Sequence, residues 1–144
     1  MNSTSSAPSP AEPRPSHVSS IRIRIHCGEL YAMGPGKADL LEAVEACRSI
    51  AGAGRALGYS YSKTRRLIDE MNFCFRSPVV ETMKGGSERG GARVTETGRR
   101  ALTVFRAMEA KAKAAIQADL GILGALLVED TAVPGTPCHP LQVR

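Results

Sequence analysis

The chain of 144 residues has no tryptophan and few other aromatic residues, namely three tyrosines and three phenylalanines. Proteins that bind single strands or RNA loops commonly stack bases on aromatic side chains, so that mode of binding is not expected here. The sequence also shows no apolar run of about 18 residues and no signal peptide. It therefore predicts a cytoplasmic protein without a membrane partner.

Cysteine is also sparse, and its spacing argues against several kinds of site. Cys27, Cys47, Cys74 and Cys138 form no C-x-x-C pair, so neither a disulfide framework nor a zinc site is predicted. His26 adjoins Cys27, but an isolated pair of this kind is more often structural than metal-binding. No paired carboxylates and no Ser-His-Asp set appear either. We therefore expect no enzyme activity, no metal and no cofactor.

Positive charge, by contrast, is concentrated in one part of the chain. The formal net charge is +5, and residues 1–54 contribute nothing to it, with five basic and five acidic residues. Residues 55–106 hold eleven basic and five acidic residues, a net charge of +6. A basic region of this kind indicates a polyanionic partner, either nucleic acid or an anionic membrane surface.

Residues 49–72 show the pattern of two short helices joined by a glycine turn. Ser49 and Ser60 stand where N-caps are needed, and Gly58 stands where a left-handed residue would end the first helix. The second helix has an apolar face and a face of polar and basic residues. That arrangement suits a recognition helix, residues 61–71, lying in the major groove of DNA. An ordinary amphipathic hairpin with a solvated cationic face remains the alternative.

Strand patterns lie on either side of this helical pair. Residues 18–26 alternate between apolar and polar side chains and predict a half-buried strand. Apolar residues at 37–48 predict a helix. After the helical pair, residues 79–95 read as two strands around a glycine-rich tip, which together would form a β-hairpin wing. Its cations could contact phosphate, although a mobile surface loop would give the same pattern.

An apolar stripe runs through residues 96–128 and predicts one long helix. The stripe is longer than a small domain could cover, so we expect a homodimer that forms through this helix. Folding of the helix back onto its own domain is the alternative. Residues 1–17 are rich in serine and proline and predict a disordered tail, and residues 129–144 predict a flexible one. A winged helix-turn-helix domain would then occupy residues 18–95.

Several of these segments resemble one known family. Residues 18–116 are similar to the N-terminal winged helix-turn-helix domain of the ModE family of molybdate-dependent transcriptional regulators, which is akin to the LysR-type DNA-binding domain. The residues that carry the resemblance include Gly36-Lys37, Ser60-Tyr61, Asp69-Glu70-Met71-Asn72, Gly85-Gly86 and Gly90-Gly91. The resemblance implies a fold that is mainly α with a small β-hairpin wing and a long C-terminal helix. The molybdate-binding domain of the family has no counterpart here, so molybdate is not expected to bind.

Taken together, the patterns and the resemblance predict a sequence-specific regulator of transcription that binds double-stranded DNA. The expected DNA-binding residues lie on the second helix and the wing: Tyr61, Ser62, Lys63, Arg65, Arg66, Lys84, Arg89 and Arg93. The alternative is a helical protein–protein interaction module whose basic face is structural. Salt dependence of duplex binding would separate the two hypotheses, because DNA binding weakens steeply as salt rises.

Overall fold

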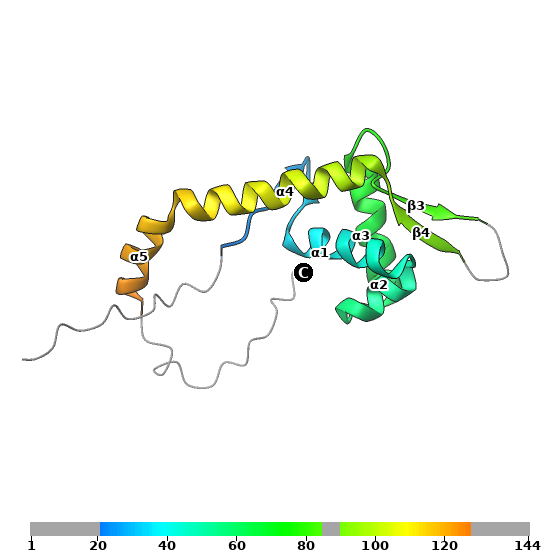
Figure 1. Cartoon of the computed structure of the whole chain (residues 1–144), viewed down its shortest axis with the longest axis horizontal. Coiled ribbons are helices and arrows are strands. Elements are labelled where there is room, and N and C mark those ends of the chain that lie inside the picture. The colour runs from blue at the N-terminus through cyan, green and yellow to red at the C-terminus, as the bar shows by residue number, and fades with distance from the viewer. Residues whose placement is uncertain (1–20, 85–89, 128–144) are drawn as a thin grey trace, which may run out of the picture. The chain divides into compact units, whose positions relative to one another are not determined.

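The computed structural model describes residues 21–84 and 90–127 (Figure 1). Its contacts divide the chain into two compact units. One unit comprises residues 22–114 and holds three helices, two β-hairpins and nearly all of a long fourth helix. The other includes, among the described residues, Ile21 and residues 115–127, which contain the last helix.

The first three helices are α1 (Pro35–Cys47), α2 (Ile50–Leu57) and α3 (Tyr61–Cys74). Their ends follow the signals in the sequence. The Ser49 hydroxyl accepts a hydrogen bond from the Gly52 N–H at 3.1 Å, and the Ser60 hydroxyl accepts one from the Lys63 N–H at 3.1 Å. Gly58 ends α2 with a φ of 69°, in the left-handed region. The predicted pair of helices with its glycine turn is therefore confirmed.

Two antiparallel β-hairpins accompany the helices. The first joins β1 (Ile25–Cys27) to β2 (Leu30–Met33), and the second joins β3 (Val80–Met83) to β4 (Gly91–Val94). Gly28 lies in the turn of the first hairpin with a φ of 63°. The second hairpin falls within the predicted wing, whose tip at residues 85–89 is outside the described part of the chain. The first hairpin replaces the single strand expected at residues 18–26.

The side chain of Asn72 links α3 to the second hairpin. Its Oδ1 accepts hydrogen bonds from the backbone N–H groups of Val79 and Val80, at 2.8 and 3.2 Å. Its Nδ2 donates to the Val80 carbonyl oxygen at 2.9 Å. One amide group thus fixes the start of β3 against the last turn of α3.

The C-terminal helical region consists of α4 (Glu96–Ala115) and α5 (Gln117–Leu126). Thr95 caps α4 by accepting a hydrogen bond from the Gly98 N–H at 3.1 Å. Ile116 separates the two helices with φ −106° and ψ 10°. The single long helix expected over residues 96–128 is therefore wrong. The apolar stripe continues across the break, so periodicity alone does not reveal one non-helical residue.

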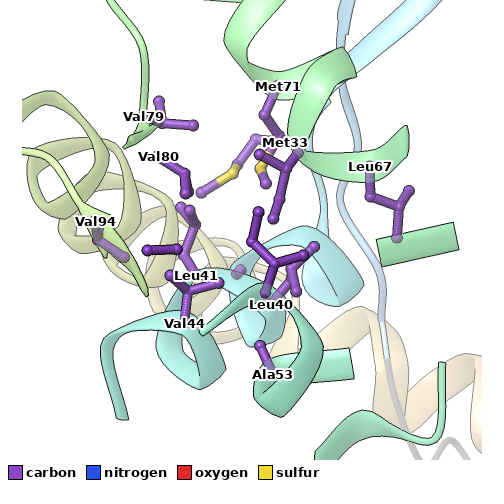
Figure 2. Close-up of a cluster of buried hydrophobic side chains, with 14 of the residues drawn as sticks. Met33, Leu40, Leu41, Val44, Ala53, Leu67, Met71, Val79, Val80 and Val94 are labelled. Carbon is purple, nitrogen blue, oxygen red and sulfur yellow. The ribbon is translucent and has the colours of Figure 1, made fainter. Parts of the chain in front are cut away.

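The hydrophobic core lies where α1, α2 and α3 meet the hairpins and α4 (Figure 2). Leu40, Leu41 and Val44 of α1 are fully buried, as predicted for the apolar face of that helix, whereas Cys47, expected on the same face, is exposed. Met71 contributes from α3, and Phe105 contributes from α4. The core thus joins segments that are up to about seventy residues apart in the sequence, which is why these elements form one unit.

The expected fold class, mainly α with one β-hairpin wing, is wrong. The described residues form five helices and two separate two-stranded sheets, so the fold is mixed α and β. The sequence did not reveal β2, because Leu30–Met33 is a short apolar segment without alternation. The expected fold was a winged helix-turn-helix followed by one long C-terminal helix. The observed fold is this mixed architecture instead. Among the helices that the structure describes, none has the length and apolar character needed to cross a bilayer.

Candidate functional site

The first turn of α3 carries three of the residues predicted to contact DNA. Tyr61, Ser62 and Lys63 are all exposed there. The Lys63 ammonium group lies 3.7 Å from the centroid of the Tyr59 ring, which is a cation–π contact. The helix end therefore presents hydroxyl groups and a positive charge, at the terminus whose backbone N–H groups favour anions.

Arg65 and Arg66 lie further along α3, and each has a carboxylate partner one turn later. Arg65 Nε lies 3.3 Å from Asp69 Oδ1, and Arg66 Nη1 lies 2.6 Å from Glu70 Oε1. Pairs at this spacing stabilise a helix modestly. They also offset part of the positive charge that the helix would present to a polyanion.

The remaining predicted residues belong to the second hairpin. Arg93 on β4 donates two hydrogen bonds to Glu81 Oε2 on β3, at 3.0 and 3.3 Å. Lys84 is exposed just after β3, and Arg89 is outside the described residues. No hydrogen bond or salt bridge between described residues joins this group to the one on α3.

Below the surface of α3, Lys37 is fully buried in the first turn of α1. Its ammonium group donates to the Tyr31 carbonyl oxygen at 2.5 Å and lies 3.1 Å from Glu70 Oε2. Burial raises the pKa of Glu70, but hydrogen bonds and charge interactions with Lys37 and Arg66 outweigh this effect and keep the pKa below its usual value. Lys37, Glu70 and Arg66 therefore form a charged network that supports α3 from beneath.

The same unit also contains an apolar groove of about 400 Å³. Its walls come from β1, β2, the segment after α3, and α4. The lining residues are Ile25, Met33, Phe75, Thr97, Arg100, Ala101, Val104, Phe105 and Met108. This groove was not predicted from the sequence, because its walls come from four separate segments. The one available signal was the apolar stripe of α4, which was assigned to dimerisation.

The groove has the size and the apolar lining that small-molecule sites commonly have. Its volume lies within the usual range of roughly 300–1,000 Å³, and most of its lining is hydrophobic. Arg100 is its single cationic lining residue, and this side chain forms no salt bridge with any described residue. Phe75 and Phe105 supply aromatic surface. Metal binding by protein side chains has no support in residues 21–84 and 90–127, which contain no cluster of three or more metal-ligating side chains.

Comparison with known proteins finds no matching family model. It finds similarity to two molybdenum-pterin-binding proteins of Rhodobacter capsulatus, MopA and MopB, at 36% identity over 91 residues and 35% over 78. The molybdenum transport protein ModE of Azotobacter vinelandii is 34% identical over 85 residues. These matches cover 63%, 54% and 59% of this chain, respectively. The chain spans about a third of the length of these relatives.

This similarity corrects the resemblance that the sequence motifs suggested. That resemblance was confined to the N-terminal DNA-binding domain of ModE. Two of the three relatives are named for binding a molybdenum-pterin, the third is named for transporting molybdenum, and none of the names refers to DNA. The assignment to a winged helix-turn-helix domain of this family, and the DNA-binding transcriptional function derived from it, are therefore corrected.

The expected partners change for the same reason. The expectation that molybdate does not bind is corrected, because it conflicts with the names of the relatives. Double-stranded DNA is no longer the expected partner, since the function that required it has been corrected. Nothing in the structure tests the eight residues named as DNA contacts one by one, but with DNA no longer the expected partner the reason for naming them is gone. Pairing of two copies through residues 96–128 and the lack of enzyme activity stay predictions.

Proposed function

We propose that this protein handles molybdenum and that its apolar groove binds a molybdenum-pterin. The observation that carries the proposal is the similarity, at 34% to 36% identity, to three proteins that are named for binding or transporting molybdenum. The similarity to ModE is also consistent with a regulatory role related to molybdate. A cytoplasmic location stays a prediction.

The lining of the groove suits a flat heteroaromatic ring such as a pterin. Phe75 offers aromatic surface and Met108 a polarisable thioether group, whereas Phe105 and Met33 line the groove but are almost fully buried. Contact with such side chains favours binding of a heteroaromatic ring, provided that the polar edges of the ring remain hydrogen-bonded. Thr97, with its hydroxyl group, is the neutral polar lining residue available for that purpose.

Arg100 would give the groove its preference for an anionic ligand. A guanidinium group binds oxyanions through two parallel hydrogen bonds, and such charge-assisted bonds are among the stronger ones in proteins. No carboxylate of residues 21–84 or 90–127 is paired with Arg100, so none of these would have to be displaced by a ligand. The chain's own residues would thus hold and orient the ligand, and the bound group would supply the metal chemistry.

Free molybdate fits the groove less well than a molybdenum-pterin does. Molybdate is a small, doubly charged oxyanion that loses strong hydration when it leaves water. Burial of such an ion needs several hydrogen-bond donors, whereas the groove offers mainly apolar surface with Thr97 and Arg100. We therefore expect a molybdenum-pterin to bind more tightly than molybdate.

Calorimetric titration of the whole chain tests the proposal. The ligands are molybdenum-pterin released from a molybdoenzyme and kept free of oxygen, molybdenum-free pterin, and sodium molybdate. Replacing Arg100 by Gln should weaken binding of the molybdenum-pterin by about 10- to 100-fold, the usual effect of losing a charged hydrogen bond. Val104→Asp should also weaken it, by placing a carboxylate in the groove. Arg55→Gln, which removes an exposed arginine of α2 outside the groove, is the matched control.

Two results would contradict the proposal. One is the lack of binding of any of the three ligands by the folded wild-type chain. The other is binding that Arg100→Gln and Arg55→Gln weaken equally, which would reflect general charge attraction and not the groove. Titration of a DNA duplex in parallel, at two salt concentrations, would show whether a polyanion is bound in place of the pterin ligand.

A further inference from the structure

Two cysteines that are 47 positions apart in the sequence meet in the folded chain. Cys27 ends β1, and Cys74 ends α3. Cys27 Sγ lies 3.9 Å from the backbone oxygen of Cys74. Both are free thiols; Cys27 is exposed and Cys74 is partly buried. Cys47, the other described cysteine, lies at the end of α1.

The Cys74 thiol is influenced by the neighbouring Cys27 side chain. Burial raises the pKa of the Cys74 thiol, and its interaction with the Cys27 side chain raises it further. The charge of Lys37 acts in the opposite direction, while that of Glu70 adds to the increase. Cys74 is therefore a protonated thiol at neutral pH, and it sits beside a second thiol that solvent can reach.

We propose that Cys27 and Cys74 form a reversible disulfide that ties β1 to the C-terminal end of α3. The proposal rests on the placement of the two thiols and is independent of the ligand assigned to the groove. Disulfide formation requires two cysteines whose backbones approach closely. Here the β1–β2 hairpin and α3 provide that approach, because both elements pack on the same core.

Oxidation would proceed by thiol–disulfide exchange with a small-molecule disulfide. The exposed Cys27 thiolate attacks one sulfur of the oxidant, which forms a mixed disulfide and releases one thiolate. Cys74 then loses its proton to solvent, and its thiolate attacks the Cys27 sulfur and releases the second thiolate. Two protein thiols are oxidised, and one small disulfide is reduced to two thiols. Reduction by an excess of a small thiol reverses both steps.

The bond would also affect the groove. Ile25 and Phe75 both line it, and they lie two residues before Cys27 and one residue after Cys74. A covalent link between the cysteines would fix the separation of these two walls. Ligand access would then depend on the redox state of the chain.

The test begins with the reduced full-length chain, incubated under native conditions with oxidised glutathione. Mass spectrometry should show a loss of two hydrogens, and a peptide map should join the segments that contain residues 27 and 74. Replacing Cys27 by Ser should abolish this product, and Cys27→Ala is a second form of the same variant. Replacing Cys47 by Ser is the control that should leave it unchanged.

Two outcomes would overturn the inference. One is a map in which Cys27 or Cys74 pairs mainly with Cys47 or Cys138. The other is a chain that stops at the glutathione adduct of Cys27 while Cys74 remains reduced. The same incubation in denaturant provides the reference, and the native chain should form the 27–74 link at least about tenfold faster, because folding holds the thiols together.

The pH dependence gives an independent check on the order of the steps. Since the pKa of Cys74 is raised, its attack on the mixed disulfide at Cys27, the closure step, is slow at neutral pH. This step should accelerate as the pH rises through the alkaline range. The charged groups that face this thiol are Lys37 on α1 and Glu70 on α3. A closure rate that is independent of pH between neutral and alkaline conditions would show that Cys74 is not the attacking thiol.

Discussion

Lys37 is a charged residue with no solvent exposure, in a position where an apolar side chain would usually be found. Its ammonium group is satisfied by the Tyr31 carbonyl, the carboxylate of Glu70 and the face of the Tyr31 ring, 4.0 Å from the centroid. Burial of a charge is tolerated when partners of this kind replace water. Lys37 therefore joins α1, β2 and α3 at one point, although from the sequence it was only the first residue of the helix predicted at 37–48 and part of the Gly36-Lys37 motif.

Replacing Lys37 by Met should strongly destabilise the fold. The change removes the buried one of the two cationic partners of a mostly buried carboxylate and leaves the more exposed Arg66, so the loss should be at most the roughly 3–5 kcal/mol typical of a broken buried pair. Unfolding by urea, followed by circular dichroism, measures the loss. Lys63→Met is the control at an exposed lysine, and it should change stability by less than about 1 kcal/mol. Equal losses in the two variants would mean that the buried network contributes no special stability.

Glu70 should make the stability of the chain depend on pH below its usual pKa of 4.5. Its pKa is lower in the folded chain, so the unfolded chain binds more protons in that range. The stabilisation is present above pH 4.5 and is lost as the pH falls through the pKa of the folded state. Urea unfolding between pH 3 and 6 should show this slope. Glu70→Gln should reduce it, whereas Glu96→Gln, at a side chain that is 91% exposed, should not.

At the scale of elements, α4 begins very close to the second hairpin. A Cβ built on Gly98 would collide with the Val79 carbonyl oxygen and lie 2.6 Å from Val94 Cγ1. Gly121 of α5 has no such neighbour within 4 Å. Two glycines in α-helices therefore have opposite roles, since one permits close packing and the other only weakens its helix.

Substituting these two glycines by alanine should have effects of opposite sign. Alanine is favoured over glycine in a helix by roughly 1 kcal/mol, so Gly121→Ala should increase helix content. Gly98→Ala gains the same propensity, but the clash with backbone should outweigh it, for a net loss of about 1–3 kcal/mol. Circular dichroism and urea unfolding provide the two measurements. Stabilisation by both substitutions would mean that α4 can shift away from Val79 without cost.

The elements that the sequence predicted correctly are those specified by local signals. Ser49, Gly58 and Ser60 marked the ends of α2 and α3, because a cap is formed by neighbours in the chain. The strand Leu30–Met33 was missed, because its length and apolar composition do not distinguish a strand from other buried segments. The break at Ile116 was missed because both sides of it continue the same apolar pattern.

At the scale of the whole molecule, the formal charge does not show how the individual charges are arranged. The sequence carries a net charge of +5, which suggested a polyanionic partner. In the structure, many of its arginines are paired with carboxylates of the same chain: Arg65, Arg66, Arg93, Arg99 and Arg106. Arg106 alone contacts Asp39, Glu42 and Glu109. A count of charges along the sequence cannot show such pairing.

The groove and the thiol pair were hidden from the sequence for a related reason. Each combines residues from segments that are distant in the chain, such as Ile25 with Phe105 and Cys27 with Cys74. A single sequence carries no direct signal for contacts of this kind. The sequence did show that α4 has apolar residues to spare, but it could not show that some of them line a cavity.

The amide of Asn72 has a further consequence, which concerns aggregation. β3 pairs with β4 along one edge, and Asn72 occupies both the N–H and the C=O of Val80. The backbone N–H and C=O groups of alternate residues point to the same edge of a strand. In β3, Thr82 is therefore the one other residue whose backbone groups point to the same edge as those of Val80. A single residue is too little to template a third strand from another molecule.

Asn72→Ala should therefore form particles sooner than Thr95→Ala, when both are followed by light scattering below their unfolding temperatures. Thr95→Ala is the control because it loses hydrogen bonds outside this edge. Equal rates of particle formation would mean that the edge of β3 is protected by something other than Asn72.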